Sequence, residues 1–250
     1  MNRLIYKTSP ATARSVQQRL PAPETVPDPQ SGFVLFVPLH YEPKYDYPLI
    51  VWLHAEGRNE NDLTRMMPQI SMRNYVAVAP RGTLSLPASK MNHAPPAYGW
   101  SQSEAHIQQA RHRVLAAIQQ ARQYRIHPQR IFLVGQGCGG TMALRLAITM
   151  PEVVRGVVSL EGPFPQGEAP LRRLAELRHL EIMLAAARSS GRYPSSSVCR
   201  DLRLLHVAGM NTTLRQYPDN VTLQRQIPGD VDRWLMEVLS RQPQTSVVAP

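Results

Sequence analysis

The stretch Ile131–Met142, IFLVGQGCGGTM, has the composition of a strand that passes through a glycine-rich turn into a helix. Its first four residues are apolar, as expected for a strand buried on both faces of a sheet. Four of the next six residues are glycines, which allow a tight turn and a close approach to neighbouring backbone. The stretch therefore indicates an α/β fold with a site around Gly137, at the carboxyl end of this strand.

Short apolar runs of β type alternate with helical patterns on both sides of this stretch. The expected strands are Phe33–Pro38, Leu49–His54, Tyr75–Pro80, Ile131–Gly135, Gly156–Leu160, Leu180–Ala185 and Thr212–Tyr217. The expected helices are Glu104–Tyr124, Thr141–Met150, Ser196–Ala208 and Gly229–Leu239. Strands that alternate with helices predict an α/β fold, with a mostly parallel twisted sheet and helices on both of its faces.

The length of 250 residues and the apolar fraction of 43% fit one sizeable domain. We expect an irregular, proline-rich arm over residues 1–30, where Pro21, Pro23, Pro27 and Pro29 lie close together. A single α/β domain is expected over residues 31–241, followed by a short tail over residues 242–250. The sequence contains no internal repeat and gives no indication of an oligomeric state.

The charge balance is strongly basic. Lys and Arg number 28 against 18 Asp and Glu, which gives a formal net charge of +10, and all but three of the basic residues are arginines. Such an excess can attract nucleic acid, an anionic membrane or an acidic partner. Because the arginines form no dense run, we favour a solvated basic surface, and a basic nucleic-acid-binding protein stays an alternative.

Other classes of protein are disfavoured by what the sequence lacks. No run of about 18 uncharged apolar residues occurs, so no membrane span is expected. Two cysteines, Cys138 and Cys199, make neither a disulfide framework nor a four-thiolate zinc site. The start of the chain has no apolar signal-peptide segment, and we expect a cytoplasmic protein. The histidines are too widely spaced to indicate a metal site, and no cofactor is expected.

Five motifs in order resemble the α/β-hydrolase superfamily, closest to its carboxylesterase and phospholipase-like esterase branch. They are Val51–Gly57 (VWLHAEG), Ala79–Gly82 (APRG), Tyr98–Trp100 (YGW), Gly135–Gly140 (GQGCGG) and Arg215–Pro218 (RQYP). The first is similar to the strand whose following loop lines an oxyanion hole in that family. The fourth is similar to the nucleophile elbow, the sharp strand-to-helix turn that presents the catalytic serine.

The resemblance implies a Ser-His-Asp triad, but this sequence departs from the pattern at each position. The elbow serine is replaced by Gly137, and Ser190 is the nearest match to the acid. No histidine follows Tyr217, and the last histidine in the chain is His206. The triad acts as a unit, so we expect a degenerate esterase-like protein. It would retain a pocket for a small acyl or carbonyl ligand, or have an interaction role.

Within this resemblance, the oxyanion hole and pocket are expected at Ala55, Glu56, Cys138 and Gly139. One alternative is an active carboxylesterase or thioesterase that uses Cys138, or an unanticipated serine, as its nucleophile. A helix amino terminus can lower the pKa of a thiol, and His54 is the nearest candidate base. The competing interpretation gives both residues structural roles: Cys138 packs within the turn, and His54 supports the loop of the oxyanion hole.

Overall fold

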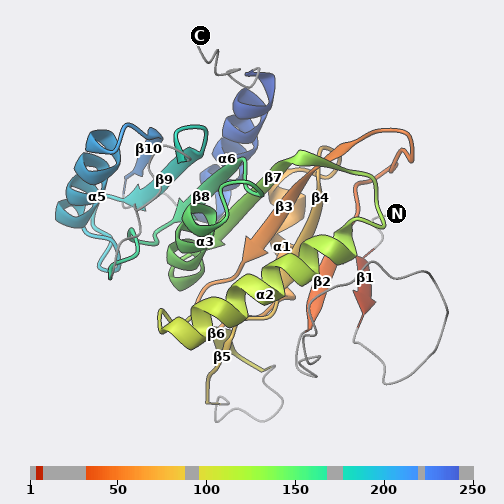
Figure 1. Ribbon diagram of the computed structural model, residues 1–250, viewed down its shortest axis with the longest axis horizontal. Helices are drawn as coiled ribbons and strands as arrows, with labels where there is room; N and C mark the ends of the chain where they lie inside the picture. The colour runs from red at the N-terminus through yellow and green to blue at the C-terminus, as the bar shows by residue number, and fades with distance from the viewer. Residues whose placement is uncertain (1–3, 8–31, 88–95, 168–176, 219–222, 242–250) are drawn as a thin grey trace, which may run out of the picture.

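The computed structural model describes residues 4–7, 32–87, 96–167, 177–218 and 223–241. Its centre is an eight-stranded sheet with the strand order β1-β2-β4-β3-β7-β8-β9-β10 (Figure 1). The strands are β1 (Leu4–Lys7), β2 (Phe33–Phe36), β3 (Tyr47–Leu53), β4 (Val76–Pro80), β7 (Ile126–Gln136), β8 (Gly156–Leu160), β9 (Glu181–Ala187) and β10 (Asn211–Tyr217). β1 and β2 run antiparallel to their neighbours, and the other pairs are parallel.

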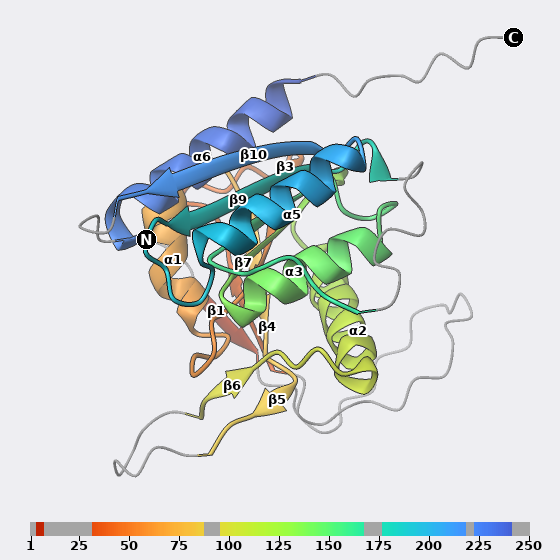
Figure 2. The ribbon, with the colours of Figure 1, turned by 90° about the vertical axis from the view of Figure 1, so that its left-hand side faces the viewer.

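Five helices of the described residues cover this sheet (Figure 2). They are α1 (Asp62–Ile70), α2 (Glu104–Ala121), α3 (Cys138–Thr149), α5 (Ser195–Val207) and α6 (Leu223–Ser240). α2, α3 and α5 lie on one face, and α1 and α6 lie on the other. A small ribbon of β5 (Leu84–Ser85) and β6 (Tyr98–Gly99) lies outside the sheet. The expected α/β domain with helices on both faces is confirmed.

The central strand β3 shows why the helices are sorted in this way. Leu49, Val51 and Leu53 point into the core cluster beneath α2 and α3, whereas Ile50 and Trp52 point into the cluster beneath α1 and α6. All five side chains are fully buried. A strand alternates its side chains between two faces, so a continuous apolar run supplies both cores at once.

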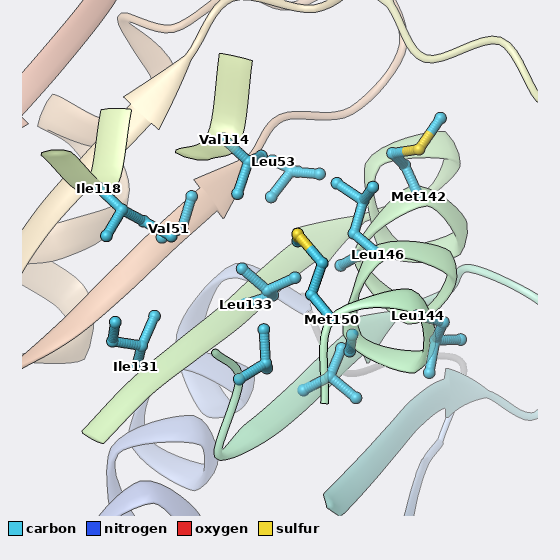
Figure 3. Close-up of a cluster of buried hydrophobic side chains, with 14 of the residues drawn as sticks. Val51, Leu53, Val114, Ile118, Ile131, Leu133, Met142, Leu144, Leu146 and Met150 are labelled. Carbon is cyan, nitrogen blue, oxygen red and sulfur yellow. The ribbon is translucent and has the colours of Figure 1, made fainter. Parts of the chain in front are cut away.

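The core beneath α2 and α3 fixes the position of α3 on the sheet. Figure 3 shows Leu133 of β7 between Val51 of β3 and Met150 at the end of α3, with Leu146 close by. Full burial of such a side chain contributes about 1.5–3 kcal/mol. This packing holds α3 against β3 and β7.

Two glycines permit an unusually close contact at the first turn of α3. A Cβ on Gly139 would overlap the backbone oxygens of Leu53 and His54, and a Cβ on Gly135 would overlap the backbone of Gly139. Backbone atoms cannot move aside as a flexible side chain can. Only glycine therefore allows β3, β7 and α3 to meet in this arrangement.

Several elements differ from the sequence-based predictions. The ribbon of β5 and β6 was not predicted, and α3 begins at Cys138 and not at Thr141. An irregular arm was predicted for residues 1–30, but Leu4–Lys7 forms β1, because it pairs with β2 as the edge of the sheet. α1 was not predicted, since Pro68 lies inside this short helix and proline usually ends a helical pattern. β7 begins earlier than predicted, at Ile126, and α6 begins earlier, at Leu223. Residues 8–31 and the tail over 242–250 lie outside the described residues.

The variant Gly139→Ala tests the close contact between α3 and β3. We expect the free energy of unfolding to fall by about 1–3 kcal/mol or more, because the new methyl group meets fixed backbone oxygens. Gly229→Ala in α6 is the matched control, since nothing lies within 4 Å of a Cβ there. It should stabilise the protein by about 0.5–1 kcal/mol. Urea unfolding measures both, and a Gly139→Ala curve equal to wild type would contradict the packing argument.

Candidate functional site

The turn between β7 and α3 has the backbone of a nucleophile elbow. Gly137, the residue that caps α3, has φ 55° and ψ −123°, a conformation that residues with a side chain rarely adopt. Its N–H donates to the Leu160 carbonyl at 2.8 Å, and its own carbonyl accepts from the Thr141 N–H at 3.1 Å. Both bonds hold the turn in place, at the position where the sequence predicted it.

A cavity of about 230 Å³ opens beside this turn. Arg192 reaches it from the loop after β9, and its Nη1 lies 3.5 Å from the place of a Cβ on Gly137. The guanidinium also lies 4.0 Å from the Glu56 carboxylate, and both side chains are more than half exposed. The described residues that line the cavity are Ala55, Glu56, Arg58, Arg65, Met66, Gln136, Gly137, Leu160, Glu161, Arg192 and Ile227. A positive charge therefore lies next to the position of an elbow side chain.

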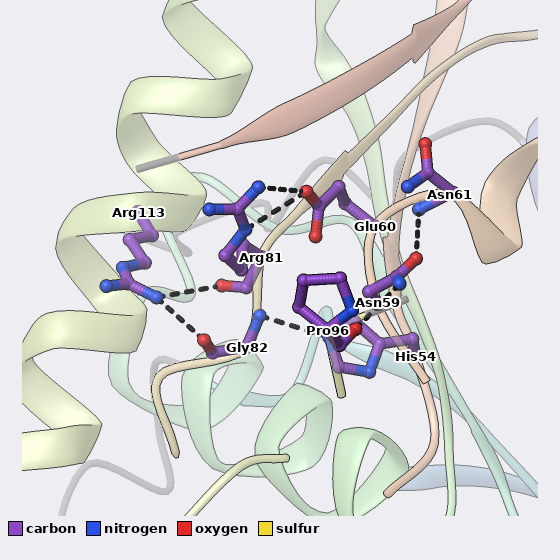
Figure 4. Close-up of polar contacts among 8 residues, drawn as sticks. All are labelled: His54, Asn59, Glu60, Asn61, Arg81, Gly82, Pro96 and Arg113. Carbon is purple, nitrogen blue, oxygen red and sulfur yellow. Dashed lines mark hydrogen bonds and ion pairs between the residues drawn. The ribbon is translucent and has the colours of Figure 1, made fainter. Parts of the chain in front are cut away.

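His54 follows β3 and is fully buried. Its Nδ1 donates to the Ala55 carbonyl at 2.8 Å. Its Nε2 accepts from the Gly82 N–H at 3.0 Å (Figure 4). The indole N–H of Trp100 donates to the His54 carbonyl. Burial lowers the pKa of His54, with smaller opposing effects from the Ala55 carbonyl and nearby carboxylates. The ring is a neutral brace whose two nitrogens already have backbone partners.

An arginine network holds the loop after β4 beside this histidine. Arg81 donates to the Glu60 carboxylate through Nε and Nη2, and Arg113 of α2 donates to the carbonyls of Arg81 and Gly82 (Figure 4). Glu60 and Arg113 are buried, so these charge-assisted bonds are shielded from water. The network fixes the backbone whose Gly82 N–H binds the His54 ring.

Cys138 begins α3 and is half-buried against the core beneath α2 and α3. Burial raises the pKa of the Cys138 thiol, and the Glu56 charge adds to this effect. Hydrogen bonds from backbone groups of Trp100 and Gly139 and the Arg192 charge act in the opposite direction but are weaker. The thiol is therefore protonated at neutral pH, unlike the thiolate that nucleophilic chemistry uses.

The other expected positions lie as follows. Ala55 and Glu56 line the cavity, whereas Gly139 packs against the end of β3. Ser190 accepts a hydrogen bond from the Tyr193 N–H within its own loop, at 3.1 Å. The loop after Tyr217, where the histidine would be sought, lies partly outside the described residues. The sequence analysis missed Arg58, Arg65, Glu161 and Arg192, because no spacing pattern relates these four residues.

Two further searches concern metals and membranes. Within the described ranges, no group of three or more His, Cys, Asp and Glu side chains is placed to hold a metal ion. None of the helices in the same ranges combines the length and hydropathy needed to cross a membrane.

The pH dependence of stability tests the state of the His54 ring. The unfolded chain protonates His54 near its ordinary pKa of 6.5, whereas the folded chain resists protonation to a lower pH. The stabilisation is thus complete above about pH 6.5 and is lost as the pH falls below it. Urea unfolding between about pH 7 and about pH 5 should show a steeper loss for wild type than for His54→Gln. Parallel pH profiles would contradict the neutral buried ring.

Comparisons with known proteins agree with this fold. The sequence matches the family model Phospholipase/Carboxylesterase over residues 43–183. Among solved structures, it is similar to a carboxylesterase from Bacillus cereus, with 16% identity, a TM-score of 0.64, and coverage of 84% of this chain and 96% of that chain. A carboxylesterase from Mesorhizobium loti gives 17% identity, a TM-score of 0.62, and coverage of 82% and 94% respectively.

A phospholipase/carboxylesterase from Dyadobacter fermentans is also similar, with 13% identity, a TM-score of 0.60, and coverage of 83% of this chain and 97% of that chain. No curated protein matches the sequence significantly. At identities this low, the similarity shows that the chain shares the fold of these structures, and it does not show a shared activity. The family model, however, matches more than half of the chain. The chain therefore belongs to the phospholipase/carboxylesterase family of the α/β hydrolases.

Proposed function

We propose that this protein binds a small acyl or carbonyl compound in the cavity beside Gly137 and does not hydrolyse it. The observation that carries the proposal is the elbow itself. Its central residue has no side chain, and the Arg192 guanidinium lies 3.5 Å from where a Cβ would be. Arginine keeps its proton and so cannot act as the base that a serine nucleophile needs.

The lining of the cavity supports a binding role. None of the described side chains that line it carries a hydroxyl, a thiol or an imidazole. Acyl transfer through a covalent intermediate needs a nucleophile and a base in contact. Removal of the whole triad lowers kcat by about 10⁶ in a serine protease, and only about 10³–10⁴ over water survives.

The charges around the cavity favour a ligand with a negative or strongly polarised oxygen. Arg192 faces the elbow together with the start of α3, where helix N–H groups attract negative charge. The Glu56 carboxylate lies 4.0 Å from the same guanidinium. A short-chain carboxylate, the acid that ester hydrolysis releases, has both the expected acyl group and a negatively charged oxygen.

The alternative of a cysteine hydrolase has less support. The pKa of Cys138 is raised, and the two ring nitrogens of His54 bind backbone groups. No specific observation on the described residues favours nucleic-acid binding or an interaction role. The cytoplasmic location stays a prediction. We therefore keep ligand binding at the elbow as the proposed function.

Ester hydrolysis distinguishes the binding role from a cysteine hydrolase. We expect wild type to cleave short-chain p-nitrophenyl esters and thioesters no faster than the Cys138→Ala variant. Gly137→Ser should gain little, because a serine alone lacks its base. Circular dichroism confirms that each variant is folded. Turnover by wild type that disappears in Cys138→Ala would establish the alternative instead.

Carboxylate binding tests the role of Arg192. Calorimetric titration with butyrate should show saturable binding to wild type. Arg192→Gln should raise the Kd about tenfold or more, because a charged hydrogen bond is lost. Arg188→Gln removes the same charge from the same loop but from a residue that does not line the cavity. Equal affinities for wild type and Arg192→Gln would refute this ligand assignment.

A further inference from the structure

A second and larger cavity, of about 560 Å³, lies at the end of the sheet where the parallel strands begin, opposite the elbow. The described residues that line it come from the first half of β7, the segments before β8 and β9, and the end of α6. β8 runs from this end of the sheet to Leu160, which lies beside the elbow. A strand rises about 3.3 Å per residue, so the length of β8 separates the two cavities.

The second cavity is lined by an excess of positive charge. The described lining residues include three arginines, Arg130, Arg155 and Arg241. The acidic residue among them is Glu152, which is exposed. Arg241 is compensated by an ion pair with Glu181 at 3.3 Å. The other two arginines therefore account for the uncompensated charge.

Arg130 lies in β7, and Arg155 directly precedes the neighbouring strand β8. The Arg155 N–H donates to the Ile131 carbonyl, so the backbones of the two segments are joined next to Arg130. The Arg155 guanidinium donates only to a backbone carbonyl, that of His179, at 3.4 Å. Arg130 is half-buried, and no described residue accepts a hydrogen bond from its side chain. Two guanidinium groups without a carboxylate partner in the described chain thus border one cavity.

Part of the remaining wall is aliphatic. Val153 and Val154 precede β8, and Val238 and Leu239 belong to the last turn of α6. Binding sites for small molecules typically combine such apolar walls with a few polar groups and have volumes of about 300–1,000 Å³. A ligand that fills this cavity therefore needs an anionic end and an apolar body.

We propose that this second cavity binds a small phosphate monoester. Arg130 and Arg155 bind the phosphate, and the aliphatic wall of Val153, Val154, Val238 and Leu239 contacts the organic group. Arginine is suited to this anion, because its planar fork donates two parallel hydrogen bonds to phosphate oxygens and it carries a permanent charge. The site is independent of the elbow, since neither Arg192 nor Gly137 lines it.

Calorimetric titration of the full chain with phenyl phosphate tests this site. We expect saturable binding that is tighter than binding of inorganic phosphate or of phenol, which each lack one half of the ligand. Arg130→Gln should raise the Kd for phenyl phosphate about tenfold or more. Arg155→Gln should act in the same direction, and it carries the test if Arg130→Gln fails to fold.

Two matched variants separate this site from general charge effects and from the elbow. Arg122→Gln removes an exposed arginine that lines neither cavity, and Arg192→Gln alters only the elbow cavity. Both should leave the affinity for phenyl phosphate unchanged. Lack of saturable binding, an equal effect of Arg122→Gln, or a loss confined to Arg192→Gln would overturn the proposal. Equal affinity for inorganic phosphate would do the same, since the apolar wall would then contribute nothing.

Discussion

The close approach of the first turn of α3 to the end of β3 is the contact on which the site depends. Gly139 lies so near the carbonyls of Leu53 and His54 that a single methyl group would not fit. This contact brings the loop after β3 and the turn at Gly137 to one place, although they are far apart in the sequence. The cores beneath the flanking helices act on the site through it, because they press α3 onto the sheet.

What the site can do chemically follows from which charges gather at that place. In a hydrolytic elbow, an oxygen or sulfur nucleophile and an imidazole exchange a proton. Here the Arg192 guanidinium and the Glu56 carboxylate lie beside a turn whose central residue has no side chain, and the His54 imidazole is held by two backbone groups. We propose that such an arrangement binds an oxygen atom of a ligand by electrostatic attraction, and the proposed function rests on this.

The fold was predictable because its signals are local. The strand Gly156–Leu160 was predicted with the bounds that the structure has, and the helix after the glycine turn was predicted, although it begins at Cys138 and not at Thr141. β1 was missed because its pairing with β2 is a long-range contact, and α1 because Pro68 disguises a short amphipathic helix. The roles proposed for Arg192, Arg130 and Arg155 depend on distant segments that fold together, and no spacing in the sequence reveals that.

The conformation of Gly137 also bears on how much sequence change the chain tolerates. A serine held at φ 55° and ψ −123° would carry strain of about 1–3 kcal/mol, whereas glycine adopts this backbone freely. The free energy of unfolding of a domain is typically only about 5–15 kcal/mol, so the absence of this strain is a sizeable part of the stability. Proteins often exchange stability against activity at such positions. A chain with glycine there can accumulate more destabilising substitutions elsewhere before it unfolds.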